Sequence, residues 1–165
     1  MVNGDKMSKS LKRVKTALRA AGLADTVVET GTARTAADAA KALGCEIDQI
    51  AKSIIFAGLS SQQAILFITA GGNLVDKEKA AALANEPLGK ADAAFIRETT
   101  GFAIGGVSPV GHINPVTVFM DPRLFDFNQI WAAAGTPNHV FSITPDRLQT
   151  LCDATLQNFT AQEKM

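Results

Sequence analysis

The stretch Gly101-Phe102-Ala103-Ile104-Gly105-Gly106-Val107-Ser108-Pro109-Val110-Gly111-His112 holds four of the 13 glycines, one of the six prolines and one of the two histidines in the chain. We call residues 101–112 the glycine loop. Its paired glycines let a ligand approach the main chain, because no Cβ stands in the way. Pro109 fixes its own φ and favours an extended Ser108. The loop can therefore present backbone N–H groups to a ligand; the alternative is a tight structural crossing between two strands.

A second unusual feature lies upstream, where Lys52 opens a strand predicted over residues 52–57. Apolar residues on both faces of this strand predict that it is central in a sheet. A partly buried ammonium needs a partner, or its pKa falls. The alternative is that the Lys52 side chain reaches solvent at the end of the strand.

Hydrophobic periodicity and capping residues predict the remaining elements. We expect further strands at 26–29, 64–70, 116–120 and 140–143, and helices at 8–21, 36–43, 76–83, 93–99 and from Pro145 onward. We expect a turn at 85–89, a helical turn packed on the core around Phe125, Phe127, Ile130 and Trp131, and loose ends over residues 1–6 and after Gln157. The prediction is one α+β domain, residues 1–165 with a core of about 8–157, in which a mixed, mostly antiparallel sheet is surrounded by helices.

Composition excludes several classes of protein. Lysine plus arginine number 16 and aspartate plus glutamate 16, so broad electrostatic capture of a nucleic acid is not expected. Cys45 and Cys152 are isolated, which argues against a zinc site or a disulfide framework and favours a reducing cytoplasm. The polar, basic N-terminus is unlike a signal peptide, and no apolar run is long enough to span a bilayer. Motifs for a serine nucleophile, a P-loop or a dinucleotide site are missing, so no cofactor is expected.

Two segments carry a resemblance to a known family. Gly105-x-x-x-Pro109 resembles the substrate loop of the YbaK/ProX aminoacyl-tRNA deacylases, and Gln49-Ile50-Ala51-Lys52-Ser53-Ile54-Ile55-Phe56 resembles the strand with their catalytic lysine. These free-standing trans-editing enzymes are related to the editing domain of some prolyl-tRNA synthetases. The resemblance runs from about Thr30 to Leu151 and implies a fold like that of YbaK.

The resemblance implies hydrolysis of the ester in mischarged aminoacyl-tRNA, such as misacylated tRNA-Pro, in support of translation fidelity. It implies that the protein contacts the acceptor end of the tRNA and that a synthetase is a further partner, and it implies no binding of DNA. It also implies that groups of the substrate itself take part in the hydrolysis. Lys52 and Gly105 are then the catalytic residues. Substrate contacts are expected from Gly106, Val107, Ser108, Pro109, His112, Thr30 and Asp121, and no metal ligands are expected.

Several of these assignments have structural alternatives. Thr30 and Arg34 also suit ordinary turn and cap chemistry, and Asp121 could orient Lys52 or a water or simply form an Asp-Pro turn. His139 is expected to be an ordinary surface or core residue. The basic face of the first helix could touch RNA phosphates or be a solvated helix face. For the whole chain, a non-catalytic module that binds tRNA ends, nucleotides or proteins, and a hydrolase of small esters, both remain open.

Overall fold

The computed structural model describes residues 8–161, and the frayed end expected for residues 1–6 lies outside that range. Five α-helices, α1 (Lys9–Ala20), α2 (Ala36–Leu43), α3 (Lys77–Ala84), α4 (Ala93–Thr100) and α5 (Pro145–Cys152), surround one sheet. Its strands are β1 (Val28–Glu29), β2 (Ile50–Gly58), β3 (Ala64–Ala70), β4 (Leu88–Lys90), β5 (Thr117–Met120), β6 (Ile130–Ala133), β7 (His139–Ile143) and β8 (Thr155–Leu156). The 3-10 helices η2 (Ile47–Gln49) and η3 (Pro122–Asp126) complete the described elements.

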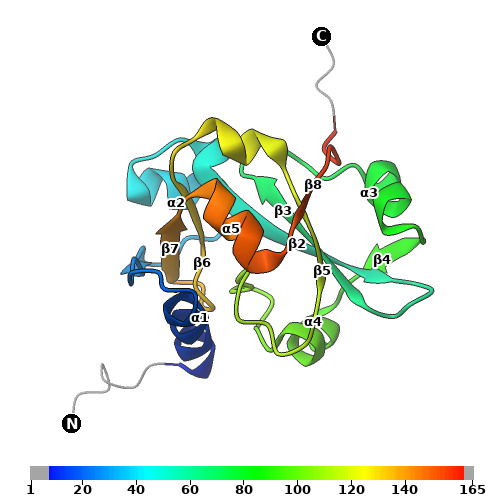
Figure 1. The fold of residues 1–165 in the computed structure, drawn as a ribbon, viewed down its shortest axis with the longest axis horizontal. Coiled ribbons are helices and arrows are strands. Elements are labelled where there is room, and N and C mark those ends of the chain that lie inside the picture. The colour runs from blue at the N-terminus through cyan, green and yellow to red at the C-terminus, as the bar shows by residue number, and fades with distance from the viewer. Residues whose placement is uncertain (1–7, 162–165) are drawn as a thin grey trace.

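The sheet has the order β1-β7-β6-β2-β3-β5-β8, with β4 paired to β2 beside this path. Four strand pairings are antiparallel and three are parallel. The mixed, mostly antiparallel sheet predicted from the sequence is therefore confirmed. Figure 1 shows β2 and β3 crossing the middle of the molecule, with helices placed around them.

Side chains that alternate along the strands build apolar layers on both faces of the sheet. One face carries Leu66 and Ile68 of β3 and packs against α1, α4 and α5. The other face carries Ile65 and Phe67 and packs against α3, while Ile50 of β2 packs against α2. Helices on both faces explain why residues Ala64 to Ala70 of β3 are all buried.

Capping residues place several helix boundaries. Thr35 accepts a hydrogen bond from the Asp38 N–H and begins α2, and Gly44 ends it with φ 68°. Asp92 accepts from the Phe95 N–H and begins α4. The predicted boundaries of α2 and β3 match those of the structure.

Three local predictions are wrong. Ile130 and Trp131 belong to strand β6 rather than to a helical turn, because β6 pairs with both β2 and β7. Part of the predicted 85–89 turn is strand β4, paired with the end of β2. Residues 158–161, the described part of the chain after Gln157, are not loose, because Phe159 is fully buried against Phe67, with ring centroids 4.9 Å apart.

Candidate active site

A cavity of about 530 Å³ lies where β6 separates from β2. β6 pairs with β2 only at Ile50 and Ala51, and β4 pairs with it only from Phe56 onward. Residues 52–55 therefore have no strand partner on this edge. The cavity occupies this gap, and α2, the ends of β6 and β7, and the glycine loop close it.

The walls of the cavity are mostly small and apolar, with a few polar groups among them. Trp131 and Ile50 supply larger apolar surfaces, and Thr30, Lys52 and His139 supply polar ones. The small residues are alanines at positions 33, 36, 37, 39, 51, 132 and 133. Such a lining accepts a compact group and orients it through few polar contacts.

Lys52 lines this cavity and does not extend freely into solvent. Its Nζ donates a hydrogen bond of 2.6 Å to the Asn73 backbone carbonyl. Burial lowers the pKa of Lys52, and the carboxylates of Asp48 and Asp121 oppose that shift. The site therefore holds a partly desolvated cation at a fixed position on the cavity wall.

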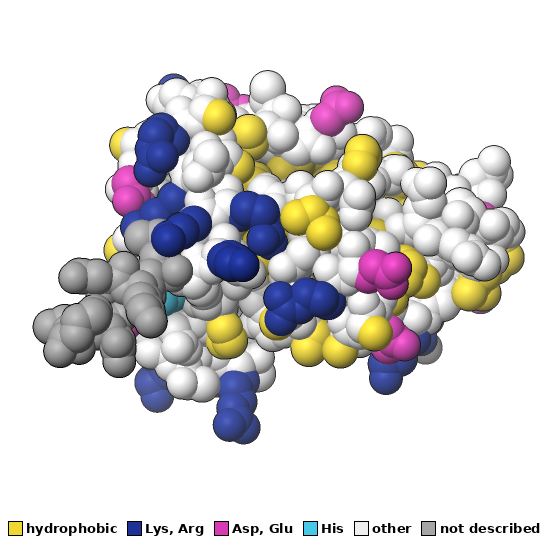
Figure 2. All heavy atoms as spheres, turned by 90° about the horizontal axis from the view of Figure 1, so that it is seen from below, with side chains coloured by type: hydrophobic (Ala, Val, Ile, Leu, Met, Phe, Trp, Pro, Cys, Tyr) yellow, Lys and Arg dark blue, Asp and Glu magenta, His cyan; other side chains and the backbone are white. Residues whose placement is uncertain are grey.

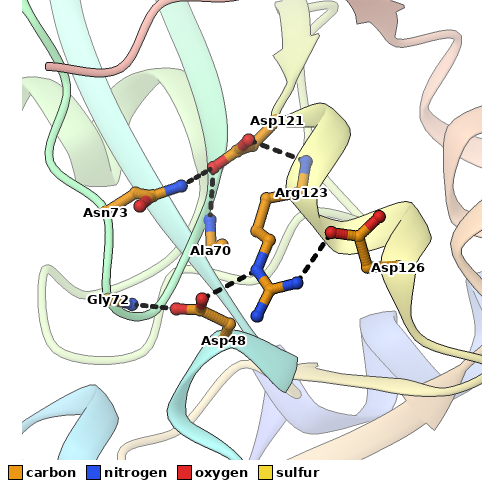
Figure 3. A network of polar contacts seen from close by, with 7 residues as sticks. All are labelled: Asp48, Ala70, Gly72, Asn73, Asp121, Arg123 and Asp126. Carbon is orange, nitrogen blue, oxygen red and sulfur yellow. Dashed lines mark hydrogen bonds and ion pairs between the residues drawn. The ribbon is translucent and has the colours of Figure 1, made fainter. Parts of the chain in front are cut away.

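Asp121 organises the turn that carries the Asn73 carbonyl (Figure 3). Its carboxylate accepts hydrogen bonds from the Ala70 N–H at 3.1 Å, from Asn73 Nδ2 at 2.9 Å and from the Arg123 N–H at 3.0 Å. Asp121 is only 3% exposed and is not part of the cavity wall. It therefore acts on Lys52 through Asn73 and through its charge, and it also forms the Asp-Pro turn expected from the sequence.

Asp48 fixes the same turn from the other side. It accepts the Gly72 N–H at 2.7 Å and pairs with Arg123 Nε at 2.8 Å, as Figure 3 shows. Arg123 Nη1 also pairs with Asp126 at 2.7 Å. Residues 71–73 thus have polar anchors on two sides, which limits movement of the carbonyl that binds Lys52.

Within the glycine loop, Gly105 and Val107 line the cavity. The Gly106 N–H donates to the Ala103 carbonyl at 2.9 Å, so this amide is not available to a ligand. Across residues 8–161 the amides of Gly105 and Val107 have no hydrogen-bond acceptor. Of the amides of residues 105–107, only that of Gly106 is thus used within the described chain.

Gly106 is needed for a close backbone approach. A Cβ at this position would lie 2.8 Å from Thr136 Cα, whereas a Cβ on Gly105 would meet only Pro137 Cγ, at 3.8 Å. Thr136 and Pro137 line the cavity themselves. The contact at Gly106 therefore sets the distance between two walls of the site.

The second half of the glycine loop is buried behind the cavity. The fully buried Ser108 accepts the Val110 N–H through Oγ at 3.2 Å, and the Pro109 carbonyl accepts the Cys152 thiol at 3.3 Å. His112 Nε2 donates to the Ser108 carbonyl at 2.6 Å, and burial lowers the pKa of His112. The structure does not bring Ser108, Pro109 or His112 to the cavity wall.

Other polar groups of the wall come from the opposite side. Thr30 lines the cavity and is held by its N–H, which donates to the Asn138 carbonyl at 2.8 Å. Arg34 also lines it and is exposed. His139 lines it with Nδ1 2.7 Å from Thr136 Oγ1 and Nε2 3.8 Å from Glu29 Oε1.

Sequence reasoning missed His139 and Trp131 as residues of the cavity wall. A histidine at the start of a predicted strand, after a Gly-Thr-Pro-Asn turn, was the available signal for His139. Among residues 8–161, no group of three His, Cys, Asp or Glu side chains could hold a metal ion. No helix in that part of the chain is long and apolar enough to cross a membrane.

Comparisons with known proteins identify the family of this chain. The sequence model of the aminoacyl-tRNA editing domain matches residues 30–151. "Uncharacterized protein YwhH" of Bacillus subtilis (strain 168) is 31% identical over 140 residues, which cover 84% of this chain and 88% of that protein. A crystal structure of "a putative trans-editing enzyme for prolyl tRNA synthetase" is 41% identical, with a TM-score of 0.88, and covers 95% of this chain and 100% of that one.

A second solved structure, from work on epitope backbone grafting onto scaffold proteins, is 39% identical, with a TM-score of 0.88, and covers 94% of this chain and 100% of that one. The match of the family model spans the strand with Lys52, the glycine loop and both sides of the cavity. The chain belongs to the aminoacyl-tRNA editing domain family.

Proposed function

We propose that this protein hydrolyses the ester bond of mischarged aminoacyl-tRNA, acting in trans on tRNA that a synthetase has already released. The observation that carries the proposal is that Lys52, Gly105 and Val107 line one cavity, and that the amides of Gly105 and Val107 have no acceptor within residues 8–161. One similar solved structure is described as a trans-editing enzyme for prolyl-tRNA synthetase, and this similarity makes misacylated tRNA-Pro the first substrate to test.

The cavity suits the aminoacyl end of such a substrate. Its volume of about 530 Å³ lies within the range of small-molecule sites. Editing is needed because one methylene gives a synthetase only about 1–3 kcal/mol of discrimination. An alanine-lined cavity admits a small wrong amino acid together with its ribose, and larger side chains meet the wall formed by α2 and Trp131.

The reaction needs a water, donors for developing charge and a proton for the leaving group. The water oxygen bonds to the ester carbonyl carbon, the bond from that carbon to the ribose oxygen breaks, and the ribose oxygen receives the proton that the water loses. We assign the Gly105 and Val107 amides to the carbonyl oxygen as it becomes an oxyanion. Removal of one such donor typically costs about a hundredfold to a thousandfold in rate.

Lys52 acts in this scheme as a positioned cation. Its ammonium donates to the Asn73 carbonyl, so it keeps further N–H donors for a substrate phosphate or for the reactive water. The scheme assigns no protein base. The hydroxyl next to the ester on the same ribose can guide the proton, so a histidine in that role is not required.

The test is deacylation of a panel of tRNAs carrying alanine, cysteine or serine, with tRNA-Pro first. Lys52→Ala is expected to lower kcat/KM at least about tenfold, because it removes a charged contact to the substrate. Lys77→Ala is the control, since Lys77 is an exposed cation at the start of α3.

Failure to deacylate any member of the panel, or full activity in Lys52→Ala, would overturn the proposal. Binding of an acceptor-stem mimic without turnover would instead identify a non-catalytic binding module. Equal activity on simple amino-acid esters and on aminoacyl-tRNA would identify a small-ester hydrolase.

A further inference from the structure

Helix α1 has an exposed face that contains cations and no acids. Its sequence, Lys-Ser-Leu-Lys-Arg-Val-Lys-Thr-Ala-Leu-Arg-Ala, has no acidic residue, although the whole chain has equal numbers of acids and bases. Leu11, Val14 and Leu18 face the core, and the exposed positions Lys9, Lys12, Thr16 and Arg19 follow one line along the opposite side. Ten residues of helix separate the ends of this line, a length of about 15 Å.

The three exposed cations of this line form no ion pair with an acidic side chain among the described residues, although the charge of Arg19 helps to lower the pKa of nearby Asp25. Lys15, by contrast, pairs with Asp25 at 3.2 Å. Arg13 points inward, with Nε bonded to the Gly111 carbonyl at 3.0 Å and its guanidinium 4.7 Å from the Phe102 ring centroid. Figure 2, which views the molecule from the side where α1 and α4 lie in Figure 1, shows several Lys and Arg side chains on this face, with fewer acidic side chains.

The packing of α1 places this helix next to a segment that lines the cavity. A Cβ on Gly135 would lie 2.8 Å from the Ser10 carbonyl carbon, so the main chain of α1 touches the segment before Thr136 and Pro137. Those two residues line the cavity. The bond from Arg13 to Gly111 joins the same helix to the end of the glycine loop. The helix is therefore held against the segment that leads into the cavity wall at Thr136 and against the buried end of the glycine loop.

We propose that Lys9, Lys12 and Arg19 bind backbone phosphates of the acceptor-stem duplex of a tRNA whose 3′ end occupies the cavity. The inference rests on the proposed function and adds to it the surface that holds the body of the substrate. Charge without an apolar centre suits a phosphate backbone better than a protein partner, since protein interfaces have apolar cores. Contact through this one helix also reconciles a neutral protein with a polyanionic substrate.

The experiment compares Lys9→Glu/Lys12→Glu with the control Lys77→Glu/Lys90→Glu, which makes the same charge change. Lys77 and Lys90 are exposed on α3 and β4, at the opposite end of the molecule in Figure 1. Both variants are expected to fold, because Lys9, Lys12 and Lys77 lie near helix N-termini, where glutamate is favourable, and Lys90 is an exposed residue at the end of β4. Each protein is tested for binding of an acceptor-stem minihelix that carries no amino acid. Deacylation is then measured on the aminoacylated minihelix and on an aminoacylated CCA trinucleotide, which has no duplex.

The α1 variant is expected to bind the minihelix about tenfold more weakly. The slope of log affinity against log salt should become shallower by about 1.4–1.8, since two phosphate contacts are lost. With the aminoacylated minihelix, the kcat/KM of this variant should fall because KM rises. With the aminoacylated trinucleotide, kcat/KM should stay unchanged. The control variant should match the wild type in every measurement.

Unchanged minihelix binding in the α1 variant, or an equal loss in the control variant, overturns the proposal. An equal loss on the trinucleotide also overturns it, because the helix would then act on the site and not on the duplex. If the wild type hydrolyses neither substrate but only the α1 variant binds the minihelix weakly, the deacylase proposal fails and the RNA-binding surface stands.

Discussion

Gly106→Ala tests whether the spacing between the two cavity walls depends on a missing side chain. The added Cβ would lie 2.8–2.9 Å from the Thr136 N, Cα and C atoms, which cannot rotate away as a side chain would. Overpacking of this kind costs about 1–3 kcal/mol of stability. At about 2–4 °C per kcal/mol for a domain of this size, Tm should fall by about 2–12 °C.

Gly105→Ala is the matched control one residue away. Its Cβ would make only an ordinary contact, 3.8 Å from Pro137 Cγ, and Gly105 has no left-handed φ. Such a replacement is expected to raise stability by about 0.4–1 kcal/mol, because it restricts the unfolded chain.

Urea and thermal unfolding measure the stability of both variants. The kcat/KM for deacylation of the best substrate measures the effect on the site. Gly106→Ala should lose both stability and kcat/KM, because the loop that carries the Gly105 and Val107 amides must move. A Gly106→Ala variant as stable as the wild type, or more stable than Gly105→Ala, would refute the close packing of Gly106 against Thr136.

Four further predictions concern residues around the site and the core. Arg13→Lys should lower stability by about 1 kcal/mol in urea unfolding, because lysine cannot reproduce a stacked, planar guanidinium. Asn73→Ala should reduce kcat/KM severalfold and shift the pH profile of deacylation, because the carbonyl that holds Lys52 loses its side-chain anchor; an unshifted profile would mean that the anchor does not position the lysine. Since burial lowers the pKa of His112, the unfolded chain takes up the proton first, so stability should fall as pH drops below about 6.5, and the decline should be smaller in His112→Gln. Phe159→Ala should cost about 3–5 kcal/mol, whereas a C-terminal segment without core contacts would lose almost nothing.

Elements whose signals are local were predictable from the sequence. The cap of α2 at Thr35 and its end at Gly44 depend on hydrogen bonds and a backbone conformation within that segment. The hairpin of β2 and β3 follows from two apolar runs separated by a short polar turn. The pattern around Lys52 left two outcomes open, a partly buried ammonium or a side chain that reaches solvent, and only the resemblance to the deacylase family favoured the first; β2 in fact begins at Ile50, two residues before Lys52.

Elements that depend on distant partners could not be predicted. The run containing Ile130 and Trp131 is apolar and short, so its pattern does not distinguish a helical turn from a strand; pairing with β2 and β7 decides the matter. Phe159 follows a polar segment, and only the position of Phe67 across the sheet explains its burial. The cavity itself results from the separation of β6 from β2, which no local pattern specifies.

The glycine loop unites two interpretations that the sequence left as alternatives. In its first half, Gly105 and Val107 line the cavity, and their amides have no acceptor within the described residues. Its second half is buried structure, in which His112 binds the Ser108 carbonyl. Ordering the amides of a flexible loop around a developing oxyanion would cost free energy, whereas donors that are already in place avoid that cost. The tight crossing is therefore the physical condition for the ligand-binding role, and a substitution that loosens the buried half should weaken catalysis without touching the substrate.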